Sequence, residues 1–157
     1  MILFKAMISL DNHAIKKNTH RIRFNGRTNK RFIGNSSTVL TAQKYLENRL
    51  FYIHKDIYGG KTITEFINCK LIFYYPYEKY YTKKGKVSMN LADLSNLYEL
   101  PQDALQKAKV IEDDWQIVGH DGSTRALSFD ENYHLEIEIT QRVVDEKREK
   151  DNKRVKR

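Results

Sequence analysis

The sequence of 157 residues lacks the features of several common kinds of protein. Its single cysteine, Cys69, excludes an internal disulfide and any metal site built from clustered cysteines. No apolar run approaches the roughly 18 residues that a membrane-spanning helix needs. The first residues lack the basic start and the small-residue cleavage site of a secretory signal peptide. We therefore expect a globular protein with one core, located in the cytoplasm and with no membrane partner.

Motifs of several enzyme classes are missing as well. The chain has no glycine-rich phosphate loop of the Walker type, no G-x-S-x-G motif and no pair of histidines at metal-ligand spacing. The five histidines are scattered, and we interpret each as a surface or packing residue. His120 is the one of interest, because it lies near an acidic turn in the sequence.

Basic residues outnumber acidic ones and are unevenly distributed. The formal net charge is +8 and the pI is about 9.5, a balance that favours a polyanionic partner. Residues 16–31 contain seven Lys or Arg and no acid, and residues 79–86 interleave lysines with Tyr80 and Tyr81. A half-buried strand with a solvated face is the structural alternative for the first segment. The predicted DNA-binding residues are Lys16, Lys17, Arg21, Arg23, Arg27, Lys30, Arg31, Lys83, Lys84 and Lys86.

Hydrophobic periodicity predicts a chain in which strands and helices are mixed. Strands are expected at residues 1–10, 66–75, 115–118, 125–128 and 133–140, with a hairpin at 21–33 around Asn25-Gly26. Helices are expected at 35–53 and 93–107, and Pro101 should kink or break the second one. Residues 1–140 then form one domain, and 141–157 form a charged tail that is either a solvated helix or disordered.

The acidic residues gather in one stretch, residues 93–118, which holds six carboxylates. If the helix continues past Pro101, Asp93, Asn96, Glu99 and Asp103 lie on one of its faces. The other acids of the stretch are Glu112, Asp113 and Asp114, and the last two stand at the start of the next strand.

Such a cluster has two interpretations. Neighbouring carboxylates raise one another's pKa unless a cation neutralises them, and hard oxygen ligands suit Mg²⁺ or Mn²⁺. A bound ion of this kind could serve to cut a nucleic-acid backbone. The alternative is a solvated helix face followed by a surface turn, and the spacing by itself favours this alternative.

Three blocks of this stretch resemble the signature of RusA-type Holliday junction resolvases, a family common in bacteria, prophages and phages. The family pattern is D-L-D-N-L, a lysine two residues on, D-A-L, and then D-D before an apolar strand. The chain has DLSNL at 93–97, QDAL at 102–105 and EDDWQIV at 112–118, at matching intervals. The segments KKNTHRI at 16–22 and GRTNKRFIGNS also resemble the family, so the similarity covers roughly residues 5–140.

The resemblance implies an α/β (α+β) fold, with a mixed β-sheet and two main helices, assembled as a homodimer. It also implies a Mg²⁺-dependent crossover junction endodeoxyribonuclease that cuts four-way or otherwise branched DNA during recombination or repair in the cytoplasm of a bacterial host. Asp93 and Asp114 take the places of family aspartates that are catalytic and bind metal. Two positions depart from the pattern: Ser95 replaces an aspartate and Glu99 replaces the lysine.

These departures suggest that Glu99 replaces the missing carboxylate. The two positions are four residues apart, and a helical side chain leans towards the N-terminus, so Glu99 would lean over Ser95. The predicted catalytic residues are Asp93, Asp114, Glu99 and Asp113, and the predicted metal ligands are Asp93, Asp114, Glu99 and Asp103. Two alternatives remain: a protein of the same fold that binds branched DNA with weakened catalysis, and an interaction protein whose acids only solvate it.

Overall fold

A computed structural model of the chain describes residues 1–11, 13, 20–28, 30–35 and 37–144. Its main sheet is mixed, with the strand order β1–β7–β4–β5, and β6 pairs with the same central strand, β4. β7 runs antiparallel to both β1 and β4, whereas β5 and β6 run parallel to β4. The strands are β1 (Ile2–Asp11), β4 (Ile67–Tyr75), β5 (Ile117–Gly119), β6 (Thr124–Leu127) and β7 (Tyr133–Gln141).

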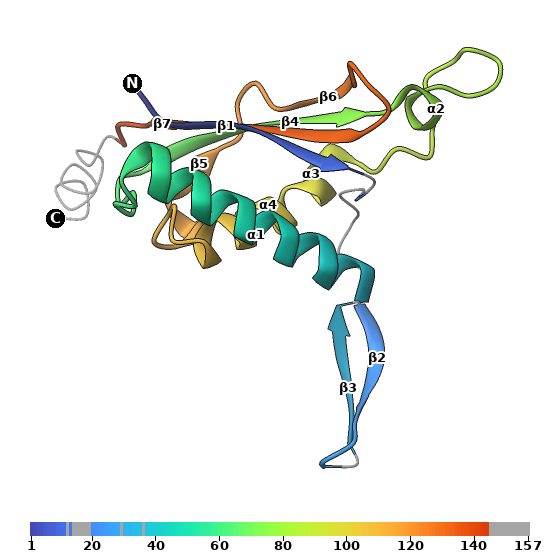
Figure 1. Cartoon of the computed structure of the whole chain (residues 1–157), viewed down its shortest axis with the longest axis horizontal. Coiled ribbons are helices and arrows are strands. Elements are labelled where there is room, and N and C mark those ends of the chain that lie inside the picture. Colours follow the sequence, from blue (N-terminus) through green and yellow to red (C-terminus); the bar gives the residue numbers. More distant parts are fainter. Residues whose placement is uncertain (12, 14–19, 29, 36, 145–157) are drawn as a thin grey trace, which may run out of the picture.

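Alternating side chains give the sheet one apolar face. In β7, Leu135, Ile137 and Ile139 are fully buried, whereas Glu136 and Glu138 lie on the opposite face. The helices α1 (Ser37–Tyr58), α3 (Leu94–Leu97) and α4 (Glu99–Lys107) lie on the same side of the sheet (Figure 1). The structure therefore has two layers, and the predicted mixed-sheet α+β fold is confirmed.

The first helix is longer than its sequence pattern indicates. The predicted stripe is buried at Val39, Ala42, Leu46 and Leu50, but α1 continues past residue 53 to Tyr58. It ends where Gly59 and Gly60 both adopt positive φ, 75° and 73°, a conformation that glycine enters without a steric penalty. The glycine pair, not the end of the apolar stripe, sets the boundary.

The second predicted helix is broken into α3 and α4 at Tyr98. Pro101 has no backbone N–H to donate to the carbonyl of Leu97, and its ring crowds that carbonyl, so α3 ends at Leu97. In α4 the proline lies in the first turn, where N–H groups have no helical partner in any case. The first helical bond of α4 runs from the Gln102 N–H to the Tyr98 carbonyl, at 3.0 Å. The predicted break is confirmed, and it lies about one helical turn before the proline.

Two tyrosines of α1 cover the free edge of β1. The Tyr58 hydroxyl accepts a hydrogen bond from the Lys5 N–H at 3.0 Å and donates one to the Lys5 carbonyl at 2.9 Å. The Tyr45 hydroxyl donates to the Ser9 carbonyl at 3.0 Å. Unpaired edge groups invite pairing with a strand of another chain, so these contacts protect the edge.

Both basic segments lie outside the sheet. The predicted hairpin forms from β2 (His20–Asn25) and β3 (Lys30–Asn35), and it extends away from the two layers beyond the start of α1 (Figure 1). The second segment begins in the short helix α2 (Tyr77–Tyr80), and the rest of it follows that helix. Lys16 and Lys17 lie outside the described residues. Among the described helices, none is long and apolar enough to cross a membrane.

Changing Tyr58 to Phe should destabilise the protein by about 1 kcal/mol, because the solvated edge of β1 loses two hydrogen bonds. It should also increase self-association through the uncovered edge. Urea unfolding and analytical ultracentrifugation measure the two effects. Tyr52→Phe is the matched control, since Tyr52 is 61% exposed on the same helix. An unchanged unfolding midpoint for Tyr58→Phe would show that the edge contacts contribute nothing.

Candidate functional site

A short helical turn carries the acids that follow α4. Residues Asp114–Gln116 form the 3₁₀ helix η1, so β5 begins at Ile117 and not at Trp115 as predicted. Gln116 is completely buried, and its amide donates to the carbonyls of Ile63 and Glu65, both at 3.0 Å. Its side-chain oxygen accepts from the Asp113 N–H at 2.7 Å. These three bonds fix the turn against the segment that leads into β4.

The acids of α4 lie near this turn. Glu99 and Asp103 are four residues apart on α4, where side chains are neighbours. The pKa of Asp103 is raised, first by burial and next by the charge of Glu99; Lys107 lowers it, and Asp114 and Glu47 raise it. The packing of η1 on α4 therefore brings Asp114 near enough to Asp103 for their charges to interact, and Glu99 acts on Asp103 from the same helix.

Asp114 itself carries a raised pKa. The largest cause is a hydrogen bond with the side chain of Asp113, followed by burial and by the negative charge of Asp113. Asp113 also accepts a hydrogen bond from the Trp115 N–H at 3.3 Å, which orients its carboxylate. The two adjacent aspartates therefore interact directly, and a proton or a cation relieves their repulsion.

Glu47 of α1 is a member of this group that the sequence did not suggest. Its carboxylate lies 3.7 Å from the ammonium of Lys107 and accepts a hydrogen bond from Gln43 at 3.2 Å. It belongs to a different helix and no acidic motif surrounds it, so only the packing of α1 on α4 reveals its place.

Asp93 occupies a different position. It is the exposed residue that precedes α3, and its carbonyl accepts from the Asn96 N–H at 3.0 Å. Tyr98, where the helix is interrupted, keeps helical dihedral angles, φ −74° and ψ −33°, so α3 and α4 follow each other without a change of direction in the backbone at that residue. Within the described part of the chain, no three His, Cys, Asp or Glu side chains converge closely enough to hold a metal.

His120 has a packing role, as predicted. Its Nδ1 donates to the Cys69 carbonyl at 2.7 Å, which leaves Nε2 as the acceptor for the Gln102 amide, also at 2.7 Å. The ring stacks on Tyr98 with centroids 4.0 Å apart. Burial lowers the pKa of His120, so the imidazole is neutral and ties the start of α4 to β4.

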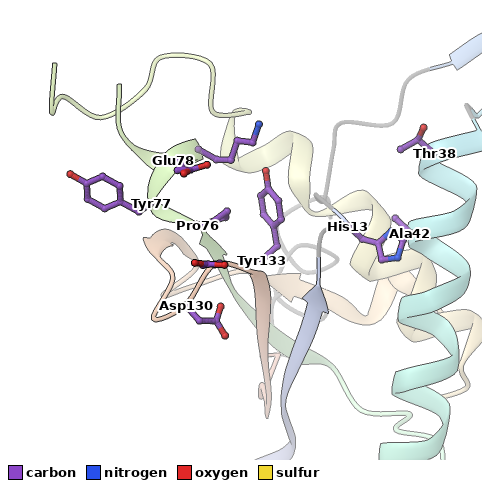
Figure 2. A pocket seen from close by; sticks show the side chains of 10 residues that line it. His13, Thr38, Ala42, Pro76, Tyr77, Glu78, Asp130 and Tyr133 are labelled. Carbon is purple, nitrogen blue, oxygen red and sulfur yellow. The ribbon is translucent and has the colours of Figure 1, made fainter. Parts of the chain in front are cut away.

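A cleft of about 740 Å³ lies at the opposite end of β4, between α1, α2 and the loop that connects β6 with β7 (Figure 2). No predicted metal ligand lines it, and three of its lining residues are acids that repel a phosphate backbone. Its lining residues are His13, Thr38, Ala42, Pro76, Tyr77, Glu78, Lys79, Asp130, Glu131 and Tyr133.

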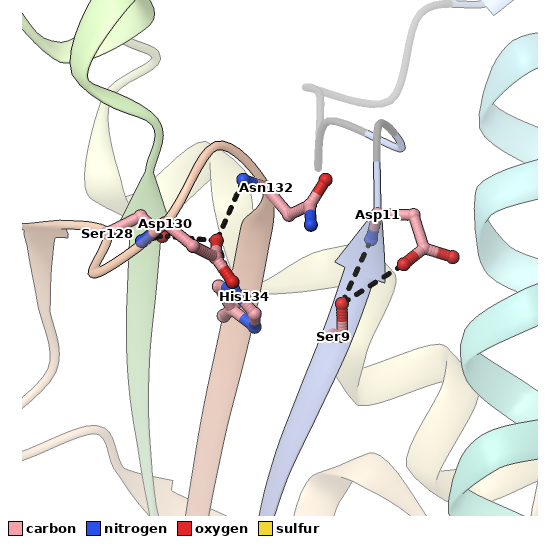
Figure 3. A network of polar contacts seen from close by, with 6 residues as sticks. All are labelled: Ser9, Asp11, Ser128, Asp130, Asn132 and His134. Carbon is pink, nitrogen blue, oxygen red and sulfur yellow. Dashed lines mark hydrogen bonds and ion pairs between the residues drawn. The ribbon is translucent and has the colours of Figure 1, made fainter.

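One of the acids that line this cleft, Asp130, is hydrogen-bonded within its own loop and to β7. Asp130 accepts hydrogen bonds from Ser128, from the Asn132 N–H and from His134 Nε2, the last at 2.7 Å (Figure 3). The hydrogen bonds from His134 and Asn132 lower the pKa of Asp130. This carboxylate therefore holds its own loop in place, unlike Asp103 and Asp114, whose pKa values are raised.

Comparison with known proteins settles the family. Residues 16–140 match the sequence profile of the family described as Endodeoxyribonuclease RusA. The chain belongs to the RusA family. The match spans most of the chain and contains both basic segments and all the acids from Asp93 to Asp114. No curated protein matches the sequence.

Membership of the RusA family gives the site its chemical context. The family is one of endodeoxyribonucleases that resolve Holliday junctions, so the predicted recognition and the nuclease class are confirmed. The substrate is a DNA backbone, which carries negative charge at every phosphate.

Replacing Gln116 with Met should destabilise the protein by about 2–3 kcal/mol, because the carbonyls of Ile63 and Glu65 and the N–H of Asp113 each lose a hydrogen bond. Urea unfolding measures the loss. The exposed Gln141→Met is the control and should change stability by less than about 0.5 kcal/mol. Equal midpoints for the two variants would contradict a structural role for the buried amide.

Replacing Asp103 with Asn should stabilise the cation-free protein by about 0.5 kcal/mol at pH 7, because a like-charge pair at i,i+4 with Glu99 is removed. The raised pKa of Asp103 means that its ionised form opposes folding. The gain should therefore vanish as pH falls through the folded-state pKa. Thermal unfolding in EDTA at several pH values measures it, with the exposed Glu112→Gln as control. A less stable Asp103→Asn at pH 7 would contradict the repulsion.

Proposed function

We propose that this member of the RusA family is a divalent-metal-dependent endonuclease that cuts four-way DNA junctions, with its acidic site between α4 and η1. The observation that carries the proposal is the match of residues 16–140 to the RusA family, together with the packing of η1 on α4, where the charges of Glu99 and Asp114 raise the pKa of Asp103. Repulsion of this kind destabilises the free protein, and a cation relieves it. The arrangement of these carboxylates therefore suits the cation-bound protein better than the cation-free protein.

The acids of α4 and η1 would have different roles at the site. Asp114, Asp103 and Glu99 would hold Mg²⁺ or Mn²⁺ once the cation draws their carboxylates together, since these ions prefer carboxylate oxygens. Asp113 would orient Asp114 through their hydrogen bond. When bound, the cation would polarise a phosphate and stabilise the leaving oxygen.

Asp93 would act from the other end of the α3–α4 segment. It is exposed, it directly precedes α3, and it is the first residue of the block that resembles the RusA signature. Asp93 would join the site when DNA and cation draw the carboxylates together, since catalytic contacts often tighten only in the complex.

The basic segments would bind the DNA backbone. Arg27 and Arg31 of the hairpin and Lys83, Lys84 and Lys86 of the loop after α2 are exposed. Each phosphate neutralised releases counterions, so the affinity should fall steeply with salt. A homodimer would place two such sites on one junction and allow paired nicks on symmetric strands.

A second candidate function is binding of branched DNA with weakened catalysis. It is favoured by Ser95, which lacks a carboxylate, and by Glu99, which replaces a cation. This candidate predicts tight junction binding without nicking in Mg²⁺ or Mn²⁺.

Purified protein should nick a synthetic four-way junction in Mg²⁺ and leave the matched duplex intact. Asp114→Asn and Asp93→Asn should each slow nicking by about 100-fold or more, because the variants lose a charged ligand. Glu99→Gln should also slow nicking if Glu99 serves the site. The exposed Asp56→Asn on α1 is the control and should cut at the wild-type rate.

Metal binding is measured separately with Tb³⁺, whose emission is sensitised by a nearby indole. The chain's only tryptophan, Trp115, follows Asp114 directly, so bound Tb³⁺ should emit and Mg²⁺ should compete. Asp114→Asn should reduce this emission. Cutting that persists in both aspartate variants would refute the site, whereas metal and DNA binding without cutting would establish the second candidate.

A further inference from the structure

An exposed indole lies beside the acidic turn. Trp115 is the only tryptophan of the chain, and 62% of its surface is exposed. Tryptophan is highly buried on average, because its large ring gains much from leaving water. Core packing therefore does not account for the position of this side chain.

The turn that carries the indole is fixed in place. Gln116, the next residue, is completely buried, and its amide is hydrogen-bonded. The backbone N–H of Trp115 donates to the carboxylate of Asp113. The ring of Phe66 supports the indole in a T-shaped contact, with centroids 5.3 Å apart and planes at 78°. Phe66 is anchored in turn, because its carbonyl accepts from the Arg142 N–H at 2.7 Å. A pre-ordered aromatic side chain loses little entropy on binding a flat partner.

DNA offers such a partner at this place. Asp114 immediately precedes Trp115, so the indole lies next to the carboxylates that would face the scissile phosphate. The flat groups next to a phosphate are bases, and they stack on aromatic side chains whatever their sequence. In an intact duplex each base is already stacked on both sides. At a branch point, unpaired or mismatched bases leave the stack at a lower cost.

We propose that Trp115, supported by Phe66, stacks on an unstacked base beside the branch point and so positions the adjacent phosphate at the acidic turn. This inference rests on the proposed function, because the acidic turn must be the nuclease site. Trp115 is a positioning residue, and it adds affinity for the branch without taking part in the chemistry. Preference for branched DNA over duplex then comes from stacking as well as from charge.

The single tryptophan allows a direct test by fluorescence. The full-length protein is titrated with an unlabelled four-way junction or its matched duplex. Ca²⁺ replaces Mg²⁺ as the cation, so that binding is measured without cutting. Excitation is set where tyrosine absorbs little. We expect the junction to quench the Trp115 emission strongly and the duplex to change it little, although anisotropy of labelled DNA shows both to be bound.

Variants then separate stacking from structure. Trp115→Ala should bind the junction about tenfold more weakly, the loss expected for one base stack, and should bind duplex as the wild type does. Its cutting rate at saturating junction should stay near the wild-type rate while its KM rises. Trp115→Phe should recover most of the affinity. Tyr52→Ala is the matched control, because Tyr52 is 61% exposed and makes a T-shaped contact with Phe51.

Several outcomes would overturn the proposal. Junction binding without quenching would show that no base reaches the indole. Equal losses for junction and duplex, or a smaller assembly of Trp115→Ala in ultracentrifugation, would assign the residue to general binding or to an interface between copies. Failure of the metal site is a separate result: quenching would persist, but Asp114→Asn would cut normally.

Discussion

The buried amide of Gln116 is the contact on which the proposed chemistry depends. It joins the carbonyls of Ile63 and Glu65 to the N–H of Asp113, and so fixes η1 beside the segment that enters the central strand. Together with the bridge between Ile63 and Ile111, it holds the turn after α4 that carries the Asp114 carboxylate and the Trp115 indole.

The acids of this protein fall into two groups that differ in their partners. Asp130 accepts several hydrogen bonds, and its pKa is lowered, so its charge stabilises the fold. Asp103 and Asp114 lie near other carboxylates, and their pKa values are raised, so their charges oppose it. Natural proteins tolerate such repulsion where function needs it. This contrast separates a structural acid from a candidate site more clearly than acidic residues counted along the sequence.

Sequence patterns predicted the elements well and their boundaries less well. The alternation of Leu135, Ile137 and Ile139 with glutamates identified β7, because each strand residue faces the side opposite to its neighbour. Pro101 correctly indicated a break, but the break falls at Tyr98, since a proline disturbs the carbonyl four residues before it. Trp115 and Gln116, predicted as strand, are held in η1 by bonds to residues more than fifty positions away. Local pattern carries no information about such distant partners.

The sequence by itself indicated the family and, through that resemblance, the nuclease class and the mixed α+β fold, because the motif blocks and their spacing are read directly along the chain. Only the tertiary structure decided which acids meet. It brought Glu47 of α1 and Asp114 of η1 near Asp103, and it occupied both nitrogens of His120 with structural bonds. Charge interactions depend on distance in space, and the packing of α1, α4 and the sheet sets those distances.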